Sequence, residues 1–252
     1  MTLRGECIMD VLLIARLVPV LLKGAAMTME LTCLAVVLGT ALGLPIALAR
    51  LSRHPLVRGP ASLYTWSVRG TPLLMQLFLI YYGLPQVGIT LDPFPAAALG
   101  MTLNAAAYIA EILRGGILSI DRGQMEAARS LGMSYLQAMR WVILPQAVPR
   151  IIPPMGNEAI ARLKDSSLVS TIAMVDLMRA AQQMIATTFR PLEIFFAAGL
   201  FYLAMTTAFT VLFGSWERRL AERGQARVPA TARLRSALGR ALAGLASVRG
   251  IW

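Results

Sequence analysis

Three ionisable side chains recur at helical spacing in a chain that is otherwise rich in apolar residues. Glu158, Arg162 and Asp165 stand at positions i, i+4 and i+7, so an α-helix places them on one face. Glu158 precedes Arg162 by four residues, which is the better orientation for an ion pair along a helix. Such a face supports two uses, ion pairing between helices and binding of a charged or zwitterionic solute.

The helix that carries this face is interrupted in its first half by Pro149, Pro153, Pro154 and Gly156. An ionised group at the centre of a bilayer costs about 2.5–3.5 kcal/mol, so this face must look toward protein or water. A polar face beside a broken helix is where a transporter binds its cargo. We therefore predict that this face, together with Asn104, lines a solute pathway. The alternative is that these side chains only pair with one another and hold the bundle together.

The composition indicates a membrane protein. Of 252 residues, 57% are apolar and 15% are charged, and the mean hydropathy is +0.63. Soluble domains are about 45–50% apolar and about 25% charged, which argues against a disordered chain and an ordinary cytosolic enzyme. The net charge of +11 comes from 22 Arg and 2 Lys that cluster outside the apolar runs. Because of that clustering, we expect a lipid bilayer and no nucleic acid as partner.

Four uncharged runs are long enough to cross a membrane, since a bilayer core needs about 20 helical residues. They are Leu31–Ala49, Gly70–Leu91, Pro93–Ala110 and Ile194–Gly214. A fifth span is expected between Val142 and Ala173, where charged residues lower the mean hydropathy of the segment. The alternative for this fifth segment is an amphipathic helical hairpin outside the bilayer.

Charge placement supports five spans. Four arginines and no acid separate the first two runs, only Asp92 separates the next two, and further arginines follow the third and the last. Basic loops lie in the cytoplasm, which places the N-terminus outside, the C-terminus inside, and requires an odd number of spans. The fold class is therefore all-α integral membrane, with predicted spans at about 28–50, 70–90, 94–113, 142–172 and 192–214.

Two flanking segments lie outside this domain of residues 24–217. Residues 1–23 contain Asp10 and Arg16 within an apolar run, so we expect an amphipathic helix on the outer surface rather than a signal peptide. Residues 218–252 form a basic tail with leucines at helical spacing. The tail is expected either to lie on the anionic inner leaflet or to be solvated.

The first span repeats small residues every four positions. These are Ala35, Gly39, Gly43 and Ala47. Small residues at this spacing let helix backbones approach closely in lipid, so we predict tight packing against another helix of this chain or of a second one.

Residues 121–145 are expected to form two short helices joined by a sharp bend. Asp121 and Gln124 have the spacing of a capping box, and Gly132 is placed as the C-terminal stop of the first helix. Ser134, with Gln137 three residues later, opens the second helix.

This bend carries a recognisable motif. Glu126-Ala127-Ala128, followed by Gly132 and by Val142–Pro145, resembles the EAA motif of the membrane subunits of binding-protein-dependent ATP-binding-cassette importers. The motif usually has Ile where this chain has Val142. Four further stretches resemble the polar amino acid subfamily, which includes histidine, glutamine, arginine and opine permeases: Arg69–Gln76, Tyr108–Ile117, Gly123-Gln124 and Lys164–Leu168. The resemblance extends from about Gly24 to Glu217.

The resemblance implies a permease of the type I importer fold in a bacterial inner membrane. Two permease subunits, identical or related, would form the pore above two ATPase subunits, and an extracytoplasmic binding protein would deliver a polar amino acid. Glu126, Ala127 and Ala128 would form the helix that couples ATP-driven movement to the pore, with Gly132 and Pro145 shaping the loop.

The sequence lacks the residue patterns of ATP hydrolysis, of a catalytic triad and of a metal site. The two lysines, Lys23 and Lys164, do not lie in a phosphate-binding loop, and the single histidine, His54, lies in a basic loop without nearby acids. Cys7 and Cys33 have no metal-binding or disulfide pattern. We therefore expect no cofactor, no metal and no enzymatic activity.

Two other function classes remain as alternatives. A self-sufficient secondary transporter or channel predicts internal repeats, and neither half of the sequence repeats the other convincingly. An intramembrane enzyme would have to use Glu158 and Asp165 as its catalytic pair.

Overall fold

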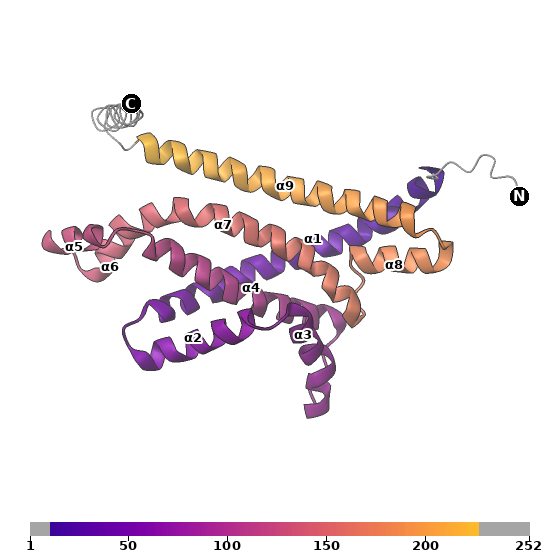
Figure 1. The fold of residues 1–252 in the computed structure, drawn as a ribbon, viewed down its shortest axis with the longest axis horizontal. Coiled ribbons are helices and arrows are strands. Elements are labelled where there is room, and N and C mark those ends of the chain that lie inside the picture. The colour runs from indigo at the N-terminus through magenta and orange to yellow at the C-terminus, as the bar shows by residue number, and fades with distance from the viewer. Residues whose placement is uncertain (1–10, 227–252) are drawn as a thin grey trace, which may run out of the picture.

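Long helices lying side by side make up most of the molecule, shown in Figure 1 as a computed structural model that describes residues 11–226. The elements in chain order are α1 (Val11–Leu51), α2 (Pro55–Arg69), α3 (Leu73–Phe78), η1 (Leu79–Gly83), η2 (Leu84–Val87), α4 (Pro93–Leu118), α5 (Arg122–Ser130), α6 (Tyr135–Ala138), η3 (Met139–Ile143), α7 (Leu144–Asp165), η4 (Ser166–Ile172), α8 (Leu177–Thr188) and α9 (Pro191–Ala226). Here η1 and η3 are π-helical turns, whereas η2 and η4 are 3₁₀ helices.

Three helices of the described part are long and apolar enough to cross a membrane: Leu17–Leu51, Pro93–Leu118 and Pro191–Leu220. The second predicted span, 70–90, is instead a shorter apolar segment, Leu73–Val87, built from α3, η1 and η2. The fourth, 142–172, corresponds to α7 and η4, whose charged residues keep it below the hydropathy of a typical span. The five-span count and the orientation of the termini therefore remain predictions.

The predicted tight packing of the first span is confirmed, and its partner is α4 of the same chain. Ala35 and Ala47 are completely buried. A Cβ atom added to Gly39 would lie 2.8 Å from the Cβ of Ala105, and one added to Gly43 would lie 3.1 Å from the backbone oxygen of Ala106. The helix backbones approach this closely because neither glycine carries a side chain.

Two helices were not expected from the sequence. We placed residues 51–69 in a basic loop, but residues 55–69 form α2, which begins with Pro55 in its first turn, where the fixed φ of proline suits a helix. Residues 177–188 form α8, and Asp176 caps it by accepting hydrogen bonds from the backbone N–H groups of Met178 and Arg179.

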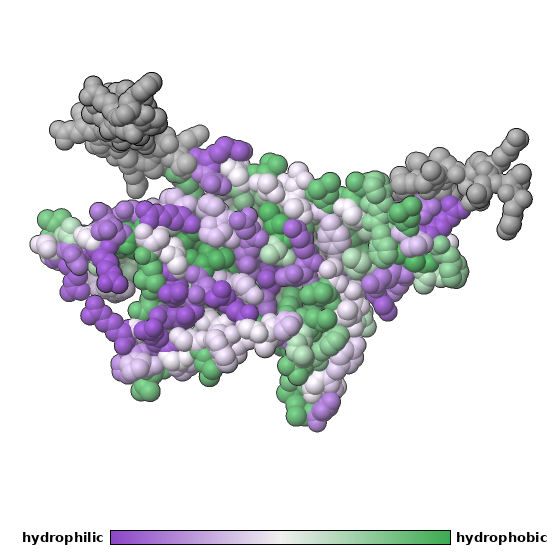
Figure 2. All heavy atoms as spheres, in the orientation of Figure 1, coloured by the Kyte–Doolittle hydropathy of each residue, from purple (hydrophilic) through white to green (hydrophobic). Residues whose placement is uncertain are grey.

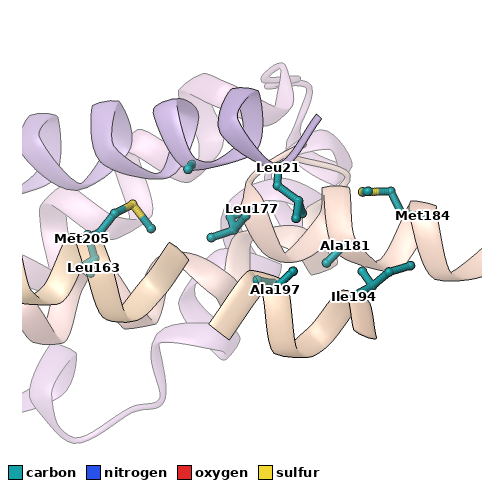
Figure 3. Packing of buried hydrophobic residues seen from close by; sticks show 10 residues of the cluster. Leu21, Leu163, Leu177, Ala181, Met184, Ile194, Ala197 and Met205 are labelled. Carbon is teal, nitrogen blue, oxygen red and sulfur yellow. The ribbon is translucent and has the colours of Figure 1, made fainter. Parts of the chain in front are cut away.

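The apolar core around α8 gathers side chains from α1, α7, α8 and α9. Figure 3 shows Leu21, Leu177 and Ala181 close together in this cluster, with Leu163 beside Met205 at its other side, and all five are buried. The hydroxyl of Thr28 in α1 also accepts a hydrogen bond from the backbone N–H of Leu177, at 3.2 Å. These contacts fix the segment that connects the polar helix α7 to α9.

The structure describes only part of the two predicted flanking segments. The predicted N-terminal segment, 1–23, is not separate where it is described, because α1 starts at Val11 and continues unbroken to Leu51. Residues 1–10 and 227–252, which include most of the predicted basic tail, lie outside the described residues.

Polar and apolar residues gather over different parts of the molecule. Figure 2 shows many hydrophilic residues over the end that holds α5 and α6 and over α2, whereas the projecting segment Leu73–Val87 is largely hydrophobic with a hydrophilic tip. The polar end is therefore the part of the molecule suited to water or to a soluble partner.

Replacing Gly39 by valine should destabilise the protein by about 1–3 kcal/mol, because the new side chain would force α1 and α4 apart. Gly199→Val is the matched control, since nothing lies within 4 Å of a Cβ atom at that position. Thermal unfolding in detergent measures the difference. Equal melting temperatures for the two variants would show that the α1–α4 approach is not a tight constraint.

Candidate functional site

The bend between α5 and α6 is fixed by its own backbone. Gly132 has φ of +82°, a left-handed conformation that glycine adopts without steric cost. Its N–H donates to the oxygen of Arg129 at 3.0 Å, and the N–H of Met133 donates to the oxygen of Ala128 at 3.2 Å. These two bonds form a Schellman motif, so the predicted stop at Gly132 is confirmed with its geometry.

The second half of the bend has the capping box expected from its sequence. The backbone N–H of Gln137 donates to the hydroxyl of Ser134, and the N–H of Ser134 donates to the side-chain oxygen of Gln137, at 3.3 and 2.8 Å. The capping box expected at Asp121 is wrong in part. Asp121 caps α5 by accepting from the N–H of Gly123 at 2.7 Å, but Gln124 is engaged elsewhere.

Gln124 connects the bend to α7. Its side-chain oxygen accepts a hydrogen bond from the side-chain amide of Gln146 at 3.2 Å, and that same amide donates to the backbone oxygen of Val142 at 2.8 Å. Arg150 of α7 also donates to the backbone oxygen of Ser119, which follows α4. α5 is therefore tied to α7, and α7 is tied to the end of α4.

The residues of the predicted coupling surface divide between exposed and buried positions. Glu126 and Ala127 are exposed on α5, whereas Ala128 is buried against the rest of the bend. Pro145 is the second residue of α7 and follows directly on the π-helical turn η3, so it lies in a continuous helical stretch to which it contributes no N–H donor. Beside them Leu131 is 84% exposed and Leu136 is 77% exposed, which is a large apolar surface at the polar end of the molecule.

The four predicted pathway residues lie together around one guanidinium. The Nε of Arg162 lies 2.9 Å from a carboxylate oxygen of Glu158, and an NH2 nitrogen lies 3.1 Å from a carboxylate oxygen of Asp165. Arg162 also donates to the side-chain oxygen of Asn104. Only 6% of the Arg162 side chain is exposed, so these partners replace nearly all of its water. We call these four residues the Arg162 cluster.

Two residues that the sequence did not single out extend this cluster. The side-chain amide of Asn104 donates to the side-chain oxygen of Gln76 in α3 at 3.0 Å, and Gln76 in turn donates to the backbone oxygen of Val68 at 2.8 Å. The guanidinium of Arg162 lies over the ring of Tyr108, 5.1 Å from its centroid. The network therefore joins α3, α4 and α7.

A signal for part of this arrangement was present in the sequence. Asn104, Tyr108 and Glu111 stand at positions i, i+4 and i+7 of α4, the same spacing that singled out Glu158, Arg162 and Asp165 on α7. Gln76 had no comparable signal, because its contact depends on how α3 turns after the break at Gly70–Pro72.

Comparison with known proteins shows the family to which the chain belongs. Residues 35–222 match the family described as "binding-protein-dependent transport system inner membrane component". The chain belongs to this family.

Relatives of this permease include two curated proteins of about 40% identity. The nopaline transport system permease protein NocM of Agrobacterium fabrum is 39% identical over 220 residues, covering 82% of this chain and 91% of the relative. The arginine transport system permease protein ArtQ of Bacillus subtilis is 40% identical over 204 residues, covering 81% and 93%.

A solved structure of similar fold is "Crystal structure of an amino acid ABC transporter with histidines". It is 43% identical to this permease, has a TM-score of 0.80, and covers 87% of this chain and 100% of that chain.

Arg162→Gln should destabilise the permease by about 3–5 kcal/mol, because it removes the charge that compensates Glu158 and leaves that carboxylate in the bundle. Lys164→Gln, two residues away and exposed, is the control and should change little. Thermal unfolding in detergent compares the two. Adding Glu158→Gln to Arg162→Gln should recover part of the loss, and a double variant no more stable than the single one would argue against the pair.

Proposed function

We propose that this chain is the membrane-spanning permease subunit of an ATP-driven importer for a polar amino acid. The observation that carries the proposal is the combination of a rigid exposed bend with a buried polar centre, joined by one helix, α7. The names of the relatives, which are nopaline and arginine transport permeases, support the amino acid class. The chain would lie in the bacterial inner membrane and cross it five times, with its C-terminus in the cytoplasm.

The exposed bend would be the contact with the ATPase subunit. Glu126 and Ala127 lie on its surface with Leu131 and Leu136, so a groove on a soluble partner can bury both polar and apolar side chains there. The Schellman motif at Gly132 and the Gln124–Gln146 hydrogen bond make the bend and α7 move as one body. Closure of the ATPases would then shift α7 and the Arg162 cluster with it.

The Arg162 cluster would be part of the solute pathway. Two carboxylates and one guanidinium leave the cluster with one excess negative charge, which suits the cationic group of an amino acid. Asn104 adds an amide that can bond either a donor or an acceptor. A second permease subunit would complete the pore.

Gly132→Val should reduce ATP-driven uptake at least tenfold, because a β-branched residue does not tolerate the left-handed conformation of this position. The measurement is uptake into proteoliposomes that contain the permease, its ATPase and the binding protein, with co-purification of the ATPase as a second readout. Gly115→Val, at an open helical position, is the control. If assembly and uptake are unchanged in Gly132→Val, the bend has no coupling role.

Asn104→Ala should lower uptake at least tenfold while the ATPase still assembles, because it removes a polar contact at the buried centre and leaves the bend untouched. Asn157→Ala changes the same residue type at an exposed position of α7 and should retain uptake. Both variants are compared in the proteoliposome assay. Normal uptake by Asn104→Ala would exclude this residue from the pathway. Accumulation of solute by the chain without any ATPase would instead favour the secondary transporter.

A further inference from the structure

Three arginines surround a single carboxylate next to the Arg162 cluster. Arg114 makes two contacts with Glu111, from Nε at 2.9 Å and from NH2 at 3.1 Å, and Arg50 donates to the same carboxylate. The NH1 of Arg69 lies 3.4 Å from its second oxygen. We call these four residues the Glu111 cluster. They come from the ends of α1 and α2 and from α4.

The charges of the Glu111 cluster do not balance. Both oxygens of Glu111 are already engaged by guanidinium groups, so this carboxylate has little capacity for further donors. The Glu111 cluster has three guanidinium groups and one carboxylate, so positive charge is in excess there. This excess suits the carboxylate group of a ligand.

A cavity of about 320 Å³ lies against the Glu111 cluster. Its lining residues are Arg50, Ser62, Thr65, Trp66, Arg69, Gly70 and Glu111. The volume is at the lower end of the range for small-molecule sites, about 300–1,000 Å³, and is suited to a solute of amino acid size. Arg50 and Arg69 both line the cavity, and a guanidinium group has several N–H donors, so each can donate to an acceptor there beyond its contact with Glu111.

Arg69 connects this cavity to the Arg162 cluster. Its guanidinium lies 5.2 Å from the centroid of the Tyr108 ring, and that of Arg162 lies 5.1 Å from the same centroid. Tyr108 stands between Asn104 and Glu111 on one face of α4, in the direction that leads along the helix toward α5. A solute that leaves the Arg162 cluster in this direction meets the cavity next.

We propose that this cavity is a second, exit-side binding site, in which Arg69 and Arg50 hold the carboxylate of the transported solute. A guanidinium group can bind a carboxylate through two parallel N–H···O bonds, an arrangement that hydroxyl or amide side chains do not offer. Glu111 acts as a positioning residue that holds the arginines at the cavity. This inference rests on the proposed function, because it takes the amino acid as the solute.

Anionic phospholipid is the other source of an oxyanion. The solute is favoured because Arg69 belongs to both the cavity and the surroundings of Tyr108, and because Thr65 in the cavity wall is buried within the fold. A site built for a lipid headgroup would not have to lie beside the Arg162 cluster.

The test measures how many solute molecules bind to the permease–ATPase complex in nanodiscs without binding protein. The probes are L-arginine and L-histidine, with agmatine and histamine as counterparts that lack the carboxylate. Wild-type complex should bind two molecules of the amino acid per permease, and agmatine or histamine should bind at the Arg162 cluster alone.

Arg69→Gln should reduce the amino acid stoichiometry from two to one and slow uptake at least tenfold. Ser62→Leu, which fills the cavity and leaves the charges in place, should do the same. Arg58→Gln removes an exposed arginine from the same helix outside the cavity, and should still bind two.

Three outcomes separate the possible failures. A wild-type stoichiometry of one that neither cavity variant changes, with normal uptake in both, overturns the second site and leaves the proposed function standing. Loss of labelled phosphatidylglycerol from Arg69→Gln, with unchanged solute binding, shows a lipid site and also overturns it. Absence of solute binding and ATP-driven uptake in the wild type would instead contradict the proposed function.

Discussion

A guanidinium group inside an apolar bundle has to be surrounded by acceptors, and this constraint governs the arrangement of three helices. Arg162 reaches Glu158 and Asp165 on its own helix, but Asn104 comes from α4 and is itself bound to Gln76 of α3. A rotation of α4 or α3 would leave a buried polar group without a partner, which costs about 1–3 kcal/mol for each group. Polar contacts therefore define how these helices face one another, while apolar packing holds them together.

Two regions that are far apart on the molecule are joined by a single helix. α7 runs from Leu144, next to the bend, to Asp165 in the Arg162 cluster, and its 22 residues give it a length of roughly 33 Å at 1.5 Å per residue. The prolines within it do not end the helix, so a displacement of its first turn is carried toward Arg162. The close contact of α1 with α4 provides the fixed support against which such a movement would take place.

Features that depend on spacing within one helix or one turn could be predicted from the sequence. The left-handed Gly132, the capping box at Ser134 and the pairing of Glu158 with Arg162 each involve residues within a few positions of one another. The bond between Asn104 and Arg162 spans 58 positions, and it depends on the rotation of two helices that no local pattern specifies. For the same reason Arg69 was taken for a loop residue, although it packs against Tyr108 at the end of a helix.

The side-chain hydrogen bond between α5 and α7 is made by two amides, those of Gln124 and Gln146, which carry no net charge. Dissolved salt weakens attraction between exposed ions over a distance of about 8 Å at physiological ionic strength, but it has little effect on a hydrogen bond between neutral groups. The exposed contact between α5 and α7 therefore keeps its strength when the ionic strength of the surrounding solution rises or falls.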